Sequence, residues 1–260
     1  MRTPDPVLVS RRGTVALVTL NRPEDRNPLD RDSAAALRDV FGTLFEDPAV
    51  RSVAVTGAGP AFCAGGDLRQ MERFGRMPVE EAYAWPEAIV DLHKLMLRAP
   101  KPVLAAVNGP AYAGGMGLAG MCDVVLATRG ARFAMPEVKV GLFPMIIVAQ
   151  LARSLPRKLL LEMMMTGEPL SADDAHRVGF VSRVYPDADA LLAGVDHYGE
   201  LFARTSPQAV RLGRAAFQLL SEMPAGAAID AAQFLNLPLF LGADLREGTA
   251  AFFEHRPPRW

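Results

Sequence analysis

Short runs of apolar, often β-branched residues alternate with longer stretches of helical periodicity along most of the chain. Such runs, bounded by turn-forming residues, are typical of strands that are buried on both faces. The predicted strands lie at 7–10, 14–20, 53–56, 103–107, 123–127 and 181–184. The first two flank Gly13 and are expected to form a hairpin. Most of the others are followed by a helix-like stretch, and this order is typical of an α/β protein.

The clearest helical pattern precedes the strand at 53–56. Apolar side chains recur there at helical spacing, at Leu37, Val40, Phe41, Leu44 and Phe45. They give the predicted helix one buried face, and we expect Asp32 or Ser33 to cap its N-terminus. Residues 69–85 follow no clear pattern, so we expect a mobile flap over a pocket in this region.

The C-terminal part of the chain is predicted to be almost entirely helical. The helices are expected at 188–205, 207–222, 225–240 and 244–255. A polar break at 204–207 interrupts this series and is a candidate domain boundary. We therefore divide the chain into a core, 1–204, and a C-terminal helical region, 205–260.

Two segments repeat the same order of strand, glycine and helix-like stretch. The first is VAVTGAGPAFCAGGDL at 53–68, and the second is VLAAVNGPAYAGGMGLAG at 103–120. Each has a glycine after its strand and then the tripeptide Ala-Gly-Gly, at 64–66 and 113–115. Glycine junctions of this kind occur in ordinary turns. Two of them side by side could instead aim two backbone N–H groups at one oxygen, which is the construction of an oxyanion hole.

Composition narrows the functional class. The chain has 260 residues, of which 50% are hydrophobic and 22% charged, and its formal net charge is -1. This balance gives no electrostatic basis for binding nucleic acid or an anionic membrane. The N-terminus lacks the pattern of a secretory signal, and no apolar run reaches the roughly 18 residues of a membrane helix, so we expect a cytoplasmic protein. Cys63 and Cys122 lie in apolar sequence and are expected to be buried and reduced.

A glycine pattern and an isolated acid are the remaining candidates for chemistry. Gly115, Gly117 and Gly120 match the G-x-G-x-x-G pattern of dinucleotide-binding folds. The next strand ends without the acid that would bind the ribose, so we do not expect a nicotinamide cofactor. The four histidines lack metal-ligand spacing, and no metal is expected. Glu137 lies between Pro136 and an apolar run, where an acid needs an explanation.

Six motifs follow one another along the chain and cover essentially all of it. They are NRPEDRNPLD, AFCAGGDL, PKPVLAAVNGPAYAGG, MCDVVLAT, ARFAMPEVKVGLFP and FFEHRPPRW. In this order they resemble the crotonase superfamily, the enoyl-CoA hydratase/isomerase family. The resemblance implies a crotonase-like spiral of ββα repeats with a C-terminal helical trimerisation region. It also implies an acyl-CoA substrate in fatty acid metabolism, a homotrimer or a hexamer built as a dimer of trimers, and no cofactor beyond the substrate's own coenzyme A.

The resemblance also implies roles for individual residues. The backbone N–H groups of Gly66 and Gly114 would hold the thioester oxygen, and Glu137 would be the catalytic acid/base. The residues implied in binding CoA are Arg26, Ala64, Asp67, Leu68, Arg69 and Arg256. Arg26 and Arg256 are the candidates for the phosphates, and Arg256 could come from a neighbouring subunit.

One position departs from the hydratases of this family. They carry another glutamate three residues after the second oxyanion-hole glycine, and Gly117 stands there in this chain. A single carboxylate can still move a proton between two carbons. We therefore favour an isomerase, in which Glu137 takes a proton from C2 of a 3-enoyl-CoA and returns it to C4. An apolar pocket would raise the pKa of Glu137, as this role requires.

Two alternatives remain open at this level. A hydratase could recruit a second acid from the flap, where Glu72, Glu80 and Glu81 lie. The chain could also bind CoA esters with little catalytic activity. Met145 stands where other members of the family place an acid, so nucleophilic chemistry of the dehalogenase type is not expected.

Overall fold

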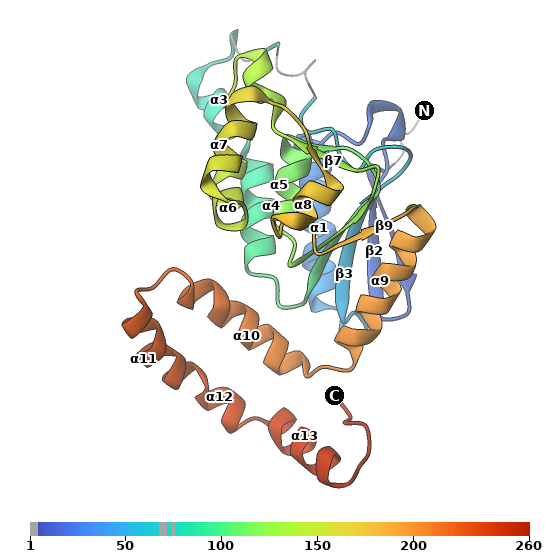
Figure 1. The fold of residues 1–260 in the computed structure, drawn as a ribbon, viewed down its shortest axis with the longest axis vertical. Coiled ribbons are helices and arrows are strands. Elements are labelled where there is room, and N and C mark those ends of the chain that lie inside the picture. Colours follow the sequence, from blue (N-terminus) through green and yellow to red (C-terminus); the bar gives the residue numbers. More distant parts are fainter. Residues whose placement is uncertain (1–4, 68–71, 74–75) are drawn as a thin grey trace.

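The predicted strands assemble into a six-stranded sheet, drawn in the computed structural model of Figure 1. The structure describes residues 5–67, 72–73 and 76–260. In sheet order the strands are β1 (Val7–Arg12), β2 (Val15–Leu20), β3 (Ser52–Gly57), β4 (Val103–Val107), β6 (Val124–Thr128) and β9 (Arg183–Tyr185). The β1–β2 hairpin is antiparallel and turns at Gly13, whereas the other neighbours are parallel.

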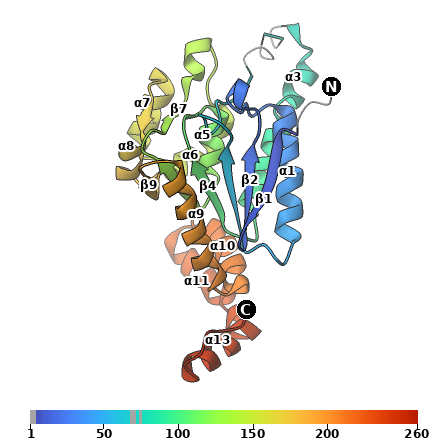
Figure 2. The same ribbon diagram turned by 90° about the vertical axis from the view of Figure 1, so that its right-hand side faces the viewer.

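Helices cover both faces of this sheet (Figure 2). Helices α1 (Arg31–Glu46) and α4 (Glu87–Leu97) pack together on one face, and α9 (Ala188–Ala203) covers the other. Successive residues of a strand alternate between the two cores, as Val53 and Ala54 do. Because both faces are buried, the parallel strands are continuous apolar runs, which explains why they were visible in the sequence.

A second, smaller sheet and several short helices complete the core. The small sheet contains β5 (Ala111–Tyr112), β7 (Arg132–Ala134) and β8 (Leu170–Ser171). The short helices are η1 (Pro23–Asp25), α3 (Val79–Ala84), α5 (Gly114–Gly120), η3 (Pro136–Val140), α6 (Met145–Ser154), α7 (Arg157–Thr166) and α8 (Ala172–Arg177). In the described part of the chain, no helix has both the length and the apolar character that crossing a bilayer requires.

The last helices leave the core and form an arm, residues 207–260 (Figures 1 and 2). The arm contains α10 (Pro207–Leu220), α11 (Ala225–Leu235), α12 (Leu237–Phe240) and α13 (Ala243–Phe253). The sequence predicted one helix over 225–240, but the structure has two, which meet at Asn236. Pro238 accounts for the break, because proline lacks the N–H that a continuous helix would use.

Two further details differ from the sequence-based expectations. Asp30, rather than Asp32 or Ser33, caps α1: it has an extended backbone just before the helix, and its carboxylate accepts from the Ser33 N–H at 2.9 Å. Both cysteines are free, as expected, but only Cys63 is fully buried and Cys122 is partly exposed. Burial raises the pKa of the Cys63 thiol to about 12, so this thiol is unreactive.

Candidate active site

The loop after β2 holds the first Ala-Gly-Gly segment in place. Arg26 and Asn27 both adopt the left-handed conformation, with φ of 60° and 55°. The buried Asn27 side chain donates to the carbonyl oxygens of Ala58 at 2.8 Å and Ala61 at 2.9 Å. The Arg26 carbonyl accepts from the Ala64 N–H at 3.0 Å. Asparagine tolerates the left-handed region better than most residues, so Asn27 suits both the conformation and the contacts.

The two Ala-Gly-Gly segments lie in direct contact. Gly65 has a φ of +88°, and a Cβ on it would lie 2.6 Å from the Cβ of Ala113 and 3.3 Å from the Gly114 nitrogen. Only glycine combines this conformation with so close an approach. The contact places Gly66 and Gly114 at the wall of one pocket.

The amides of Gly66 and Gly114 are open to a ligand. Gly114 is the first residue of α5, so the helix does not use its N–H. In the described part of the chain, neither amide donates to a backbone acceptor. Ala113, just before Gly114, has φ of 49° and ψ of −121°, an unusual conformation for a residue with a side chain. Strain of this kind is typical of functional sites.

Both glycines line an apolar pocket of about 260 Å³. Its polar or glycine lining consists of Asp30, Arg31, Gly66, Asp67, Gly114 and Glu137. The apolar lining consists of Leu29, Trp85, Pro86, Ile89, Ala113, Phe143, Pro144, Met145, Ile146 and Ile147. An apolar cavity with a few convergent polar groups is typical of a small-molecule site.

Glu137 supplies a carboxyl group to this pocket. It lies in η3 directly after Pro136, and its Oε2 atom is buried with no hydrogen-bond partner among the described residues. Burial raises the pKa of Glu137 above its ordinary value, and a hydrogen bond from its own backbone N–H only partly opposes this effect. A carboxyl with a raised pKa and one oxygen without a partner is suited to proton transfer.

Asp30, in the lining of the pocket, and the three acids considered from the sequence are less suited to that role. Asp30 is engaged structurally, because it caps α1 and forms an ion pair with Arg22 at 2.5 Å. Glu80 and Glu81 lie on the exposed helix α3, and Glu72 is exposed as well. None of the three lines the pocket, although Trp85 at the end of the expected flap does.

The glycines of the G-x-G-x-x-G pattern serve helix packing. Gly117 lies one turn after Gly114 on α5, and a Cβ on it would lie 2.2 Å from Cγ2 of Ile147 on α6. A Cβ on Gly120 would likewise lie 2.7 Å from Cδ2 of Leu151. Two bulky side chains of α6 thus pack directly on the backbone of α5. This contact between helices, rather than a nucleotide, explains the two glycines.

His93 lies behind this packing and was not singled out from the sequence. It is 8% exposed on α4, and its Nε2 atom is buried with no hydrogen-bond partner among the described residues. Burial lowers the pKa of His93 to about 4, so the ring is neutral at neutral pH. The sequence gives one indication that His93 lies near the pocket. It is four residues, about one helical turn, from Ile89, which lines the pocket.

Comparison with known proteins identifies the family. The sequence model of "Enoyl-CoA hydratase/isomerase" matches residues 10–260. The chain belongs to the enoyl-CoA hydratase/isomerase family. It is 38% identical over 249 residues to a Thermus thermophilus protein named provisionally as an enoyl-CoA hydratase, covering 96% of this chain and 98% of the relative. It is also 36% identical over 258 residues to the (E)-benzylidenesuccinyl-CoA hydratase of Thauera aromatica, covering 97% and 98%.

Solved structures of the family confirm the fold. An enoyl-CoA hydratase of Mycobacterium smegmatis superposes with a TM-score of 0.91 at 37% identity, covering 98% of both chains. The predicted crotonase fold, with its helical C-terminal region, is therefore correct. The pocket between the two Ala-Gly-Gly segments is accordingly the candidate acyl-CoA site of a family member.

The structure brings together only some of the predicted CoA-binding residues. Asp67 lines the acyl pocket, and Ala64 is held beside it by its hydrogen bond to Arg26, which is exposed. Leu68 and Arg69 lie outside the described residues. Their part in binding CoA stays a prediction.

Arg256 is not at the acyl pocket of its own chain. It lies at the end of the arm and forms ion pairs with Glu247 at 2.6 Å and Glu254 at 2.5 Å. Contact with a CoA phosphate would therefore have to be made in a neighbouring subunit. Lys101, another cation of the core, donates to the carbonyl oxygens of Leu44 and Asp47 and so has a structural role.

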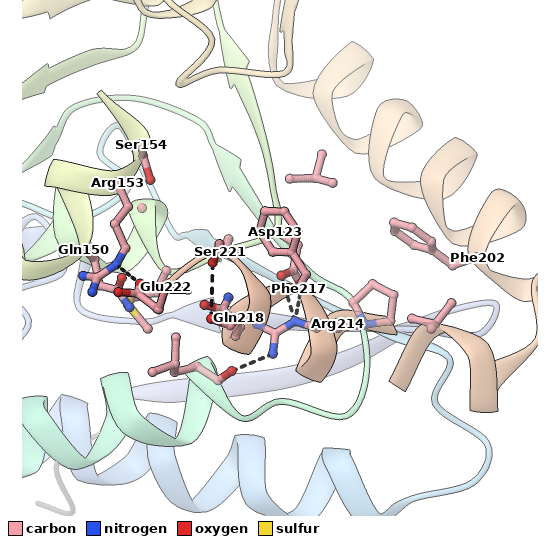
Figure 3. Close-up of a pocket in the computed structure, with 17 residues that line it drawn as sticks. Asp123, Gln150, Arg153, Ser154, Phe202, Arg214, Phe217, Gln218, Ser221 and Glu222 are labelled. Carbon is pink, nitrogen blue, oxygen red and sulfur yellow. Dashed lines mark hydrogen bonds and ion pairs between the residues drawn. The ribbon is translucent and has the colours of Figure 1, made fainter. Parts of the chain in front are cut away.

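A larger cavity of about 680 Å³ lies between the core and α10 (Figure 3). Its charged side chains are paired with one another: Arg153 with Glu222 at 2.6 Å, and Arg214 with Asp123 at 2.8 Å. Neither Gly66, Gly114 nor Glu137 lines it. This cavity lies where the arm meets the core, and it is separate from the candidate active site.

Proposed function

We propose that the chain adds water to a 2-enoyl-CoA thioester, with Gly66 and Gly114 holding the thioester oxygen and Glu137 moving the proton. The observation that carries this proposal is the pocket itself. Gly66, Gly114 and Glu137 line the same apolar space, and the Oε2 atom of Glu137 is buried without a hydrogen-bond partner among the described residues. This is the set of groups that enolate chemistry on a thioester requires.

The chemistry can be written through these groups. The oxygen of water bonds to C3, and the electron pair of the C2–C3 double bond moves toward the thioester oxygen as an enolate. Glu137 takes a proton from the water and delivers it to C2, which completes a 3-hydroxyacyl-CoA. Two preorganised N–H donors can stabilise the enolate oxygen by about 3 kcal/mol each.

The reaction of the relatives is the reason for placing hydration first. The proteins from Thauera aromatica and Mycobacterium smegmatis are both named as hydratases. The sequence favoured isomerisation because Gly117 replaces an acid, and the comparisons do not support that preference. Isomerisation of a 3-enoyl-CoA is the second candidate, for two reasons. Ile147 fills the space beside Gly117. Among the described acids of the pocket, only Glu137 has a buried oxygen without a hydrogen-bond partner.

Coenzyme A is expected to enter beside the first Ala-Gly-Gly segment. Asp67 at the pocket and the backbone of Ala64 are candidates for contacts with its pantetheine and adenine parts, together with Leu68 and Arg69. Exposed Arg26 is the candidate for a phosphate. The pocket of about 260 Å³ is at the small end of ligand sites, which favours a short acyl group.

The substrate assay separates the candidate functions. Purified protein is given 2-enoyl-CoA and 3-enoyl-CoA esters of several acyl lengths, and the products are identified by mass spectrometry and by the absorbance of the conjugated enoyl group. We expect 2-enoyl-CoA to become 3-hydroxyacyl-CoA, fastest for short chains. Conversion of 3-enoyl-CoA to 2-enoyl-CoA without hydration would show that the protein is an isomerase and not a hydratase. Tight binding of the esters without any product would leave a CoA-ester-binding protein.

We also propose that the chain assembles through its arm, as a trimer or as a dimer of trimers. No residue of α10, α11 or α12 is buried within one chain. Large apolar side chains of the arm are exposed, at Phe217, Ile229, Phe234, Phe240, Leu241, Phe252 and Phe253. So much exposed apolar surface is typical of an interface. Sedimentation velocity should give three or six times the 28.0 kDa of one chain, and a monomer would contradict the proposal.

A further inference from the structure

The seam between α5 and α6 forms one wall of the acyl pocket. In this seam Ile147 packs on Gly117, and Leu151 packs on Gly120 one turn further along. Ile147 lines the pocket, whereas Leu151 does not. The Ile147 side chain is 4% exposed and occupies the space in which a side chain at 117 would begin. Ile147 therefore both lines the pocket and packs between α5 and α6.

A buried polar group without a hydrogen-bond partner among the described residues lies close to Ile147. Cε1 of His93 is 3.6 Å from the position that a Cβ on Gly117 would take, and the adjacent Nε2 atom has no partner among the described residues. A buried imidazole nitrogen would normally bind a water if there were room for one. Ile147 fills the space beside Gly117, close to this ring. An apolar side chain that lines the pocket thus lies near a buried polar group that could hold a water.

Water is the one reactant that distinguishes the two candidate reactions. Hydration and isomerisation share the thioester oxygen site and the carboxyl of Glu137. In hydration the water oxygen bonds to C3 and its proton passes through Glu137 to C2. In isomerisation the proton leaves C2 and returns at C4, with the double bond moving between them and no water consumed. Access of water to the pocket therefore changes the ratio of the two rates.

We infer that Ile147 restrains the entry of water into the acyl pocket and thereby sets the ratio of hydration to isomerisation. The inference rests on the proposed enolate chemistry at Glu137, and it holds whichever of the two reactions is faster in the native protein. Shortening Ile147 opens space bordered by the His93 nitrogen and the pocket. Water can then occupy that space with a hydrogen-bond partner already in place.

The experiment compares Ile147→Val and Ile147→Ala with the native protein on matched 2-enoyl-CoA and 3-enoyl-CoA esters. The ratio of the hydration rate to the isomerisation rate should rise by about tenfold in Ile147→Ala and less in Ile147→Val. This is the scale on which small changes in an apolar pocket alter discrimination. NMR titration of His93 gives a readout besides activity. Its pKa of about 4 should rise toward that of a hydrated imidazole in Ile147→Ala only.

Leu151→Ala is the matched control. It removes a side chain of the same seam, four residues along α6, that packs on Gly120 but does not line the pocket. We expect it to lower the melting temperature and to leave both the rate ratio and the His93 titration unchanged. An unchanged ratio in Ile147→Ala, or an equal change in Leu151→Ala, would overturn the inference. If no variant converts either ester, the proposed function fails instead.

A stability measurement tests the steric part independently of activity. Gly117→Ala should lower the melting temperature in the native chain, because the new Cβ meets Cγ2 of Ile147. In an Ile147→Ala background, the same substitution should lower the melting temperature much less. Equal losses in the two backgrounds would show that Ile147 does not occupy this space in solution.

Discussion

Replacing Glu137 with glutamine is expected to lower kcat by about 10²- to 10⁴-fold, the usual contribution of a positioned acid/base. The amide has nearly the same shape but cannot carry a proton. KM should change little, because the thioester oxygen is still held by the amides of Gly66 and Gly114. Steady-state kinetics on the preferred enoyl-CoA ester measures both constants.

Glu80→Gln and Glu81→Gln are the controls for this prediction. Both carboxylates are exposed on α3 and lie outside the pocket, so each variant should keep nearly native rates. A large loss in either one would mean that the flap supplies the second acid, which the sequence left open. Full activity in Glu137→Gln would remove Glu137 from the mechanism.

The pH profile of the native enzyme gives a second check on Glu137. Burial raises the pKa of this carboxyl, and the carboxyl acts as a base only when it is ionised. The value of kcat/KM should therefore fall as the pH drops, and the midpoint of that acid limb should lie above the ordinary glutamate pKa. A midpoint below the ordinary value would contradict the apolar surroundings of Glu137.

Replacing Arg214 with methionine is expected to lower the free energy of unfolding by about 1.5–3 kcal/mol, the usual contribution of hydrogen bonds to a charged group. The Arg214 side chain is 9% exposed and bonds to Asp123 at 2.8 Å. It also donates to the carbonyl oxygens of Met96 at 2.8 Å, Leu97 at 3.0 Å and Ala99 at 2.9 Å. One guanidinium thus joins α10 of the arm to the C-terminal end of α4 (Figure 3).

Asp123 explains why the loss should be large. Burial raises the pKa of this carboxyl, and Arg214 opposes the effect. Without the guanidinium, the Asp123 carboxylate keeps only the Val103 N–H, at 2.9 Å, as a hydrogen-bond donor among the described residues. Chemical denaturation, followed by circular dichroism at fixed protein concentration, measures the change.

Arg153→Met is the matched control in the same cavity. Arg153 pairs with Glu222, but both side chains are about half exposed, at 54% and 53%. Solvent screens such a pair, so its loss should lower the free energy of unfolding much less than the loss of Arg214 does. If Arg153→Met and Arg214→Met lower the free energy of unfolding equally, the greater burial of Arg214 does not explain its contribution to stability.

Much of the fold could be predicted because the signals are local. Parallel strands buried on both faces appear as continuous apolar runs, and α1 shows its buried face through the spacing of Leu37 and Phe41. The two Ala-Gly-Gly segments were visible for a related reason. A backbone that must adopt positive φ or touch another backbone requires glycine, as at Gly65. Two predictions from the same local patterns were wrong: the residue that caps α1, and the single helix across Pro238.

The sequence by itself thus determined the six strands of the main sheet, the helical C-terminal region, the paired junctions and the family. It also singled out Glu137. The tertiary structure alone decided which distant side chains share a space. Gly117 marked a missing acid in the sequence, but only the packing of α5 on α6 shows Ile147 in its place, with His93 behind it. Arg214 likewise has no local signal. The physical reason is that periodicity and turn chemistry act between near neighbours, whereas the contents of a pocket depend on contacts between residues far apart in the chain.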